Sequence, residues 1–236
     1  MGDSTAQNGD LGRRATMDTR TMEWVASPSG TVWRKRLHLV GQPESAQVTS
    51  VVRYEPASSF PAHDHPEGEE ILVLEGVFSD EHGDWPAGTH LLNPEGFRHA
   101  PFSKAGCLLF VKLRQYPGLD RPSRKTDVDA LDWKATDRPG IEEKVLFDEP
   151  GFPDVTRLER WRAGAAPGPI EAAGGLEVFV LEGALETPDG TLPAGSWRRM
   201  PDGDALEATS ASGCVLYVKS GAIGLLRSAD RVAPTG

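Results

Sequence analysis

The sequence predicts an all-β chain built from two tandem barrels, and three observations support this fold class. Glycine and proline contribute 26 and 19 of the 236 residues, a share that fits many short strands joined by turns better than long helices. Short apolar segments recur between these turns along most of the chain. The pattern of turns also occurs twice, which indicates a duplication.

The duplication is visible as a repeat at one constant offset, which carries residue 74 onto residue 181. The repeated segments are Leu-Glu-Gly at 74–76 and 181–183, Pro-Ala-Gly at 86–88 and 193–195, and Val-Lys at 111–112 and 218–219. No gap is needed between about residue 60 and residue 112. Self-similarity of this kind predicts two copies of one supersecondary plan.

The repeat leads us to expect four segments. They are a disordered N-terminal tail over 1–20, a first barrel over 21–118, a second barrel over 119–226 and a C-terminal tail over 227–236.

Within the first half, strands are expected where Val, Ile, Leu and Phe cluster between turns. These segments are Gln47 to Tyr54, Glu70 to Phe78, Thr89 to Asn93 and Cys107 to Leu113. Several short strands at such spacing are typical of a β-sandwich or a small barrel. The one helix candidate is the segment 126–134.

Composition excludes several classes of function. Acidic residues exceed basic residues by 35 to 25, and no stripe of Lys and Arg stands out, so nucleic-acid binding is not expected. No apolar run approaches the roughly 18 residues of a membrane span, and the first twenty residues lack the apolar centre of a secretory signal. The two cysteines, Cys107 and Cys214, cannot form a disulfide scaffold. A cytoplasmic location is expected.

The histidines point to chemistry in the first half alone, because all six lie between residues 38 and 99. The segment that begins at His63 has the form His63-x-His65-x3-Glu69. Two histidines at i and i+2 of a strand point to the same side. Glu69 follows a Pro-Glu-Gly turn that can return its carboxylate to that side, and His99 follows a turn on a neighbouring strand. The other histidines, His38, His82 and His90, are interpreted as structural or solvated.

This donor set predicts a metal site. Three imidazoles and one carboxylate suit Fe(II), Mn, Ni, Cu or Zn better than Ca or Mg, and leave one or two coordination positions open.

The second half serves as an internal comparison. The repeat offset carries His63, His65, Glu69 and His99 onto Ile170, Ala172, Leu176 and Leu206. None of these side chains binds a metal, so we expect an apolar interior in the second barrel and one metal per chain.

The same comparison sorts the remaining polar residues. Glu70 recurs as Glu177, which favours a structural role, whereas Glu69 is lost together with the histidines. Recurring pairs are assigned to the scaffold: Arg53 with Arg160, Glu75 with Glu182, Cys107 with Cys214 and Lys112 with Lys219. Residues that change sharply are candidates for the pocket rim: Asn93, Arg98 and Phe102.

Taken together, these segments resemble the two cupin motifs, G(X)5HXH(X)3–4E(X)6G and G(X)5PXG(X)2H(X)3N. The run HPEGEEILVLEGVFSDEHGDWPAGTHLLNPEGFRHAP resembles the ChrR-like cupins in particular. Two positions depart from the motifs: the opening glycine is absent, and Ser103 replaces the final asparagine. Neither is a ligand. The resemblance implies two tandem cupin barrels, which are double-stranded β-helices of the jelly-roll type, packed as a bicupin.

The resemblance also implies candidate activities. The group includes acetylacetone-cleaving dioxygenases, which implies a non-haem, Fe(II)-dependent dioxygenase acting on a small enolisable compound such as a β-diketone. It also includes the cupin half of a zinc anti-sigma factor, so a non-catalytic cupin that senses a metal or a ligand is the alternative. Anti-sigma factors carry an N-terminal zinc-binding domain built on His and Cys, and the first twenty residues contain neither. A storage role, as in two-barrel seed cupins, fits an intact ligand set less well. We expect a small-molecule partner and leave homodimer formation open.

Overall fold

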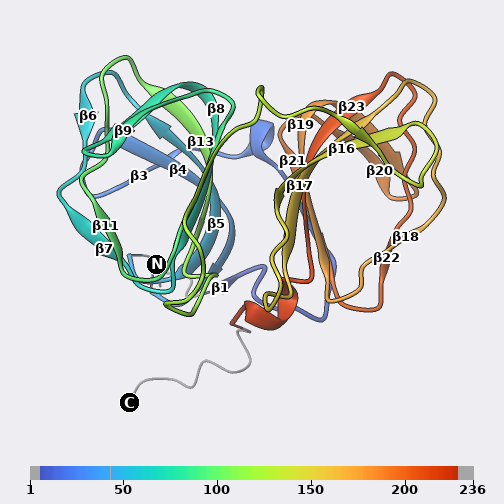
Figure 1. Ribbon diagram of the computed structural model, residues 1–236, viewed down its shortest axis with the longest axis horizontal. Coiled ribbons are helices and arrows are strands. Elements are labelled where there is room, and N and C mark those ends of the chain that lie inside the picture. The colour runs from blue at the N-terminus through green and yellow to red at the C-terminus, as the bar shows by residue number, and fades with distance from the viewer. Residues whose placement is uncertain (1–5, 43, 228–236) are drawn as a thin grey trace. The chain divides into compact units, whose positions relative to one another are not determined.

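The computed structural model describes residues 6–42 and 44–227, and strands dominate this part of the chain (Figure 1). Its helical segments are two short 3-10 turns, η1 (Thr19–Thr21) and η2 (Ile223–Leu225). The predicted all-β fold class is therefore confirmed. None of the helices described has the length and apolar character needed to cross a membrane.

The chain divides into two compact units. The first unit draws on residues 1–10, 23–129 and 227–236, and the second on residues 11–22 and 130–226. Each sequence repeat therefore supplies most of one unit, but the boundaries are not those of the repeats.

The first unit is built on an antiparallel sheet in the order β1-β4-β5-β13-β8-β10-β14. Strands β3, β6, β9 and β12 extend this sheet at its margins, and β7 and β11 form a separate two-stranded ribbon. The strands are β1 (Ala6–Gln7), β3 (Val25–Ala26), β4 (Val32–Val40), β5 (Gln47–Tyr54), β6 (Ser58–Ser59), β7 (His63–His65), β8 (Glu69–Asp80), β9 (Gly83–Pro86), β10 (Thr89–Asn93), β11 (Phe97–His99), β12 (Phe102–Ser103), β13 (Cys107–Leu113) and β14 (Arg124–Asp127).

The second unit repeats this plan in the order β15-β16-β17-β23-β19-β21-β2, with β20 paired to β19 and a separate β18–β22 ribbon. Its strands are β2 (Ala15–Asp18), β15 (Lys134–Ala135), β16 (Ile141–Phe147), β17 (Val155–Trp161), β18 (Ile170–Glu171), β19 (Leu176–Thr187), β20 (Gly190–Pro193), β21 (Ser196–Met200), β22 (Ala205–Leu206) and β23 (Cys214–Ser220).

The strand predictions for the first half agree closely with the structure. Strands β5, β10 and β13 have the predicted bounds, and β8 is longer than predicted at both ends. The helix candidate at 126–134 is wrong, because β14 and β15 occupy its two ends. Residues of β14 pair with β10, so hydrogen bonds to a sheet edge satisfy the backbone that a helix would have satisfied internally.

The disordered tail predicted for residues 1–20 is also wrong for the part that the structure describes. Strand β1 pairs with β4, and β2 pairs with β21. A polar segment can be ordered in this way because an edge strand offers a row of backbone donors and acceptors that requires no apolar side chain. Residues 1–5 of the predicted tail lie outside the described residues. At the other end, the Arg227 N–H donates to Gln47 Oε1 at 2.8 Å, and residues 228–236 are not described.

The edge strands β2 and β14 show a reciprocal exchange between the repeats. Strands β10 and β21 are equivalent in the repeat; β14 covers the edge of β10, and β2 covers the edge of β21. However, β2 lies at the N-terminal end of the first repeat, and β14 lies at the N-terminal end of the second repeat. Each repeat therefore contributes its leading strand to the sheet of the other.

Recurring residue pairs hold the same scaffold positions in both units. The Arg53 guanidinium lies over the Trp24 ring at 4.5 Å, and Arg160 lies over Trp133 at 4.6 Å. These contacts combine a cation–π attraction with packing of the arginine stem. The scaffold role predicted for this arginine pair is confirmed.

The cysteines are buried and free in both units. Burial raises the pKa of the Cys107 thiol and of the Cys214 thiol to about 11. Both therefore remain protonated near neutral pH and act as small apolar side chains, as the sequence predicted.

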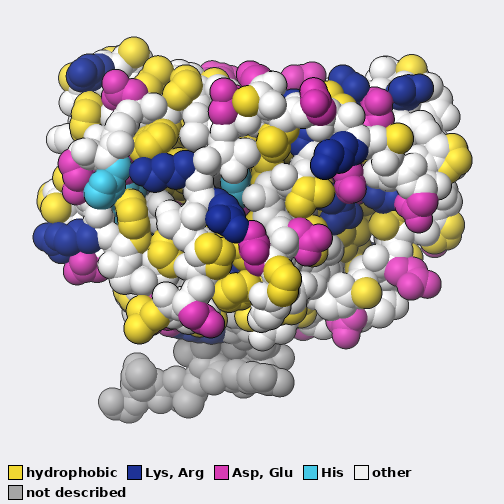
Figure 2. All heavy atoms as spheres, viewed as in Figure 1, with side chains coloured by type: hydrophobic (Ala, Val, Ile, Leu, Met, Phe, Trp, Pro, Cys, Tyr) yellow, Lys and Arg dark blue, Asp and Glu magenta, His cyan; other side chains and the backbone are white. Residues whose placement is uncertain are grey.

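Charges of both signs are interspersed on the face drawn in Figure 2, and no broad surface of Lys and Arg alone is visible there. This agrees with the net charge of −10. The expectation that the chain does not bind nucleic acid stays a prediction.

The repeated Leu-Glu-Gly motif has a structural explanation in its glycine. Gly76 has a φ of +72°, and a Cβ at this position would lie 2.2 Å from the carbonyl oxygen of Gly106. The equivalent Gly183 has a φ of +69° and the same close approach to Gly213, at 2.1 Å. Glycine is therefore required here both for its backbone angle and for the absence of a side chain.

We predict that Gly76→Ala destabilises the protein much more than Gly30→Ala does. Gly30 has a similar φ of +73°, but no atom lies within 4 Å of its hypothetical Cβ. The backbone angle alone should cost about 1 kcal/mol in Gly30→Ala, and the added clash should raise the cost to about 3 kcal/mol or more in Gly76→Ala. Urea unfolding of both variants measures the difference, and equal losses would contradict the steric explanation.

Candidate metal centre

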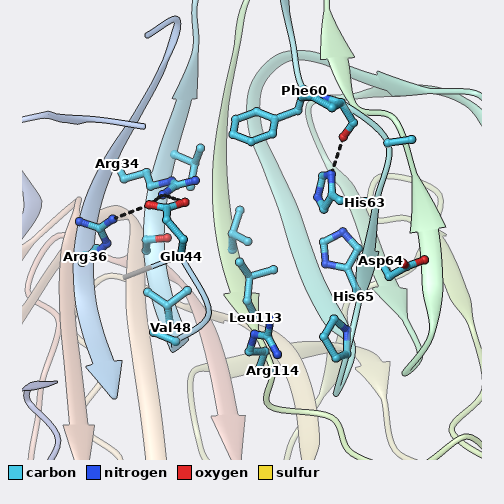
Figure 3. Close-up of a pocket in the computed structure, with 17 residues that line it drawn as sticks. Arg34, Arg36, Glu44, Val48, Phe60, His63, Asp64, His65, Leu113 and Arg114 are labelled. Carbon is cyan, nitrogen blue, oxygen red and sulfur yellow. Dashed lines mark hydrogen bonds and ion pairs between the residues drawn. The ribbon is translucent and has the colours of Figure 1, made fainter. Parts of the chain in front are cut away.

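The first two candidate ligands are positioned by the alternation of a single strand. His63 and His65 are the first and last residues of β7, so their rings point to the same side, as Figure 3 shows. Asp64 lies between them and points to the other side. His65 is buried, and His63 is partly exposed.

The third imidazole comes from the partner strand of the ribbon. In the β7–β11 pair, His99 is opposite His63, and Phe97 is opposite His65. One nitrogen from each of His63, His65 and His99 can be chosen so that all three lie within 4.8 Å of one another. The Nε2 atoms of His65 and His99 are 2.9 Å apart.

Glu69 completes the group from the start of β8. The preceding turn places Glu67 and Gly68 at φ values of +60° and +71°. The Glu69 Oε2 atom then lies 3.7 Å from the Nε2 atoms of both His65 and His99. The structure thus brings all four predicted residues together, and their role as metal ligands stays a prediction.

The spacing of the two buried imidazoles fits a transition metal. Two metal–nitrogen bonds of about 2.1 Å at a right angle place their nitrogens about 3 Å apart, close to the 2.9 Å between His65 and His99. The carboxylate of Glu69 needs only a small shift to join them. Nitrogen and carboxylate donors in this combination suit Fe, Mn, Ni, Cu or Zn.

Hydrogen bonds on the far side of two rings fix their orientation. His99 Nδ1 is 3.0 Å from Asp80 Oδ2, and His63 Nδ1 is 2.8 Å from the Pro61 carbonyl oxygen. Both Nδ1 atoms must donate, so each ring in its neutral form keeps the lone pair of Nε2 for a metal. Partners of this kind orient metal-binding histidines in many proteins.

The sequence reasoning missed Asp80. A signal was present, because the repeat offset carries this residue onto Thr187, so the carboxylate is lost together with the ligands. Burial alone would raise the pKa of Asp80, but its hydrogen bonds to His99, the His82 backbone and Trp85 more than offset this and lower the pKa. Asp80 is therefore an anion that holds the His99 proton on Nδ1.

The two buried imidazoles differ in protonation tendency. Burial is the largest influence on His65 and lowers its pKa. Burial acts in the same direction on His99, but the hydrogen bond to Asp80 and the charge of Glu69 outweigh it and raise the pKa. His65 is therefore a neutral candidate ligand, and the imidazole of His99 is the more basic of the two rings.

The three candidate rim residues have different locations. Asn93 is buried, and its Nδ2 donates to Glu69 Oε2 at 3.1 Å, so it orients a candidate ligand. Arg98 alternates with His99 on β11, and its exposed side chain pairs with Asp64 at 3.2 Å and not with the candidate ligands. Phe102 lies on β12 and is not among the residues that line the two cavities described below, so its rim position stays a prediction.

Glu70 has the structural role that the repeat indicated. One of its carboxylate oxygens is 2.8 Å from His90 Nε2. Its counterpart Glu177 accepts a hydrogen bond of 2.7 Å from Trp197 Nε1, where Trp197 replaces His90. The other two histidines outside the group are also explained: His82 is exposed, and His38 Nδ1 is 3.1 Å from the Asn8 carbonyl oxygen.

Two cavities meet at the candidate ligands. A small inner cavity of about 80 Å³ is lined by the four predicted ligands together with apolar and aromatic side chains. A larger outer cavity of about 390 Å³ shares His63 and His65 with it (Figure 3). The residues common to both are Arg34, Val52, Phe60, His63, His65, Val111 and Leu113.

The second unit has no such site at the equivalent positions. Ala172, Leu176 and Leu206 belong to its buried apolar cluster, and Ile170 packs against that cluster. The apolar interior predicted for the second barrel is confirmed. Trp161, fully buried, occupies the position of Tyr54 in the first unit, so a larger side chain takes the space.

Comparison with known proteins gives one family and several distant structures. The family model described as the ChrR Cupin-like domain matches residues 12–117 and again residues 123–224. No curated protein matches the sequence.

Three solved structures show a similar fold at low identity. A protein from Nostoc punctiforme PCC 73102, provisionally described as a dioxygenase, is 16% identical with a TM-score of 0.69, and the alignment covers 88% of this chain and 82% of that one. The bacterial pirin YhhW from Escherichia coli, in complex with nickel(II), is 15% identical with a TM-score of 0.61 and coverages of 88% and 98%. Salicylate 1,2-dioxygenase from Pseudaminobacter salicylatoxidans is 16% identical with a TM-score of 0.57 and coverages of 86% and 76%.

We predict that the chain binds one equivalent of transition metal. Elemental analysis of the purified protein should give about one metal per chain, and the His63→Ala/His99→Ala double variant should give almost none. The second unit cannot compensate, because an ion among Ala172, Leu176 and Leu206 would lose its hydration without gaining a ligand. Two equivalents in the wild type, or one retained in the double variant, would contradict this prediction.

We also predict that Asp80→Asn weakens metal binding by about 10- to 100-fold while the protein stays folded, because it loses the anionic partner of His99. Asp64→Asn is the matched control, since Asp64 lies beside two candidate ligands but points away from them. Competition with a chromophoric chelator measures the affinities, and equal effects of the two substitutions would count against orientation by Asp80.

Proposed function

Because the chain belongs to the ChrR cupin-like family, with the domain present twice, we propose that its first repeat is a metal-dependent dioxygenase. Its substrate would be a small enolisable oxygen compound such as a β-diketone. The observation that supports this most directly is the convergence of His63, His65, His99 and Glu69 beside a cavity. The second repeat, in this proposal, provides structure and no second active site.

The metal would be held by the three imidazoles and Glu69, and Fe(II) is the ion we favour. Such an ion, when bound, supplies Lewis acidity and electron transfer to oxygen substrates. Cupin folds at low identity include the nickel-bound pirin and salicylate 1,2-dioxygenase. These likenesses support a metal-binding fold, and the choice of metal and reaction is our proposal.

The protein's own residues would prepare this site in two ways. Asp80 and the Pro61 carbonyl hold two imidazoles with Nε2 directed inward, and Asn93 donates a hydrogen bond to Glu69 Oε2. These contacts limit the side-chain movement that is needed when the ion enters. Orientation of this kind increases affinity by reducing the entropy lost on binding.

The cavities suit a small substrate. The inner cavity of about 80 Å³ is lined by Phe60, Ile71, Phe78 and Leu109 beside the candidate ligands. An apolar wall excludes water and so strengthens electrostatic interactions at the reacting atoms. A compound that chelates through two oxygens could reach the ion from the outer cavity, whose volume is about 390 Å³.

A regulatory cupin is the second candidate, and the family model itself favours it, because ChrR-type proteins gave the domain its description. A sensor would bind a metal or a ligand at the same four residues without turning over. The two functions therefore differ in product formation and not in metal content.

We predict that the Fe(II)-loaded protein consumes oxygen with at least one member of a β-diketone panel, and that His63→Ala abolishes this turnover. His63 is partly exposed, and the equivalent Ile170 in the second unit shows that the fold does not need an imidazole there. The variant should therefore remain folded. His82→Ala is the matched control, since His82 is an exposed histidine outside the group.

The other outcomes of this experiment are also informative. Global unfolding of His63→Ala would indicate a structural metal. Undiminished turnover in His63→Ala would rule out the proposed mechanism. Stoichiometric metal binding without oxygen uptake on any diketone would favour the regulatory function.

A further inference from the structure

We infer that the substrate of the first repeat carries a carboxylate, and that this group binds Arg34 and Arg36 in place of Glu44. The inference rests on the proposed function for the chelating end of the substrate. It adds a charged end, at the opposite side of the outer cavity.

The two arginines face the cavity because of their places on β4. Arg34 and Arg36 alternate with Trp33 and Lys35, so the two pairs lie on opposite sides of the strand. Trp33 and Lys35 make contacts elsewhere: Trp33 Nε1 donates to Glu55 at 2.7 Å, and the Lys35 ammonium lies over the Trp24 ring. Arg34 and Arg36 line the outer cavity.

Both arginines meet a carboxylate there. Arg34 Nη1 is 2.9 Å and 3.2 Å from the two carboxylate oxygens of Glu44, and Arg36 Nη2 is 3.7 Å from one of them. Figure 3 shows Glu44 beside both guanidinium groups, across the cavity from His63 and His65. The geometry of this pocket therefore already accommodates a carboxylate.

Glu44 is suited to being displaced. Its side chain is 55% exposed, whereas those of Arg34 and Arg36 are 19% and 18% exposed. The arginines are thus fixed in the wall, and the carboxylate sits on a more exposed residue between β4 and β5. Because Glu44 is the more exposed partner, its carboxylate can return to water when another carboxylate takes its place. A substrate carboxylate could then make charge-assisted hydrogen bonds to a guanidinium fork.

The wall between the two charged ends is mainly apolar. Leu113 lies between the histidines and the arginines in Figure 3, with Arg114 beside it, and Val48, Val52 and Val111 also line the outer cavity. The complete cavity therefore offers a chelating end, a hydrocarbon middle and a cationic end. An enolisable diketone joined by a short alkyl chain to a carboxylate matches all three.

The second unit lost the arginines together with the metal ligands. Strand register identifies the counterparts: Arg34 pairs with Val52 in the first unit, and Glu143 pairs with Glu159, the repeat equivalent of Val52, in the second. By the same register, Val145 replaces Arg36. The first repeat therefore has both the arginines and the histidines, and the second repeat has neither at the equivalent positions. This joint loss supports a shared function for the two groups.

Charged residues in the second unit neutralise one another at this place. Arg157 Nε is 2.8 Å from Glu159 Oε1 and 3.7 Å from Glu143 Oε2. Trp161 Nε1 donates to the other oxygen of Glu159 at 2.9 Å. The carboxylate of this ion pair, on Glu159, is therefore buried, whereas the carboxylate of the Arg34–Glu44 pair is exposed.

Calorimetry with a matched pair of probes tests the inference. The probes are 5,7-dioxooctanoate and its uncharged amide, 5,7-dioxooctanamide, which share the diketone and the alkyl chain. Each is titrated into protein loaded with Fe(II) under nitrogen, so that affinity is measured without turnover. We expect the carboxylate to bind at least about tenfold more tightly than the amide, from charge-assisted hydrogen bonds.

Variants then assign this preference. In the Arg34→Gln/Arg36→Gln double variant, the acid-to-amide affinity ratio should fall to about one, through loss of affinity for the acid. In Glu44→Gln, the ratio should rise, because the competing carboxylate is gone. Lys35→Gln, on the same strand but on its other side, should keep the wild-type ratio.

Three results would overturn the inference. They are equal affinities for the two probes, no binding of either probe, or a preference that survives in the double variant. A preference for the carboxylate that is lost in the double variant, with no oxygen uptake on either probe, would instead support the inference and reject the dioxygenase function. The two failures are therefore distinguishable.

Discussion

The pairing of β7 with β11 is the constraint on which the site depends. Its register places His99 opposite His63, and the alternation along β7 places His65 on the same face. A shift by one residue would turn one strand's imidazoles away from the other's. The remaining features then follow from this ribbon: Asp80 meets the far side of His99, and Glu69 enters from β8 with its carboxylate near both buried rings.

The two repeats separate what the fold needs from what the site needs. Both keep the Leu-Glu-Gly glycine, the arginine stacked on tryptophan and the carboxylate at Glu70 or Glu177. Only the first keeps the histidines, Asp80 and the arginines on β4. Because Ala172, Leu176 and Leu206 fill the equivalent interior with apolar side chains, the second unit has a core where the first has a cavity. A functional pocket leaves space that is not closely packed, and a unit without such a pocket can fill that space with apolar side chains.

Most of the fold and the four converging residues could be predicted from sequence, because strand alternation and a gapless repeat are both local signals. The contacts of Arg34 and Arg36 could not. The constant offset of the repeat holds from β5 onward and would match Arg34 to Ile141, whereas the strand register matches it to Glu143. A comparison at constant offset therefore assigns the residues of β4 to the wrong counterparts on β16. The ordered N-terminal segment was missed for a different reason: β2 is stabilised by backbone pairing with β21, a strand of the second repeat, and composition carries no sign of this.

The exchange of β2 and β14 has a consequence for the origin of the chain. A protein with only one repeat would leave the β10 edge bare, unless a second molecule of the same kind supplied its leading strand and received one in return. Two copies trading strands would thus form a swapped dimer with two identical sites. In the present chain both leading strands are supplied within one molecule, so the strand pairing does not depend on the two repeats being identical. The second repeat can then lack the candidate ligands and still be required for the fold, because its leading strand β14 covers the edge of β10 in the first repeat.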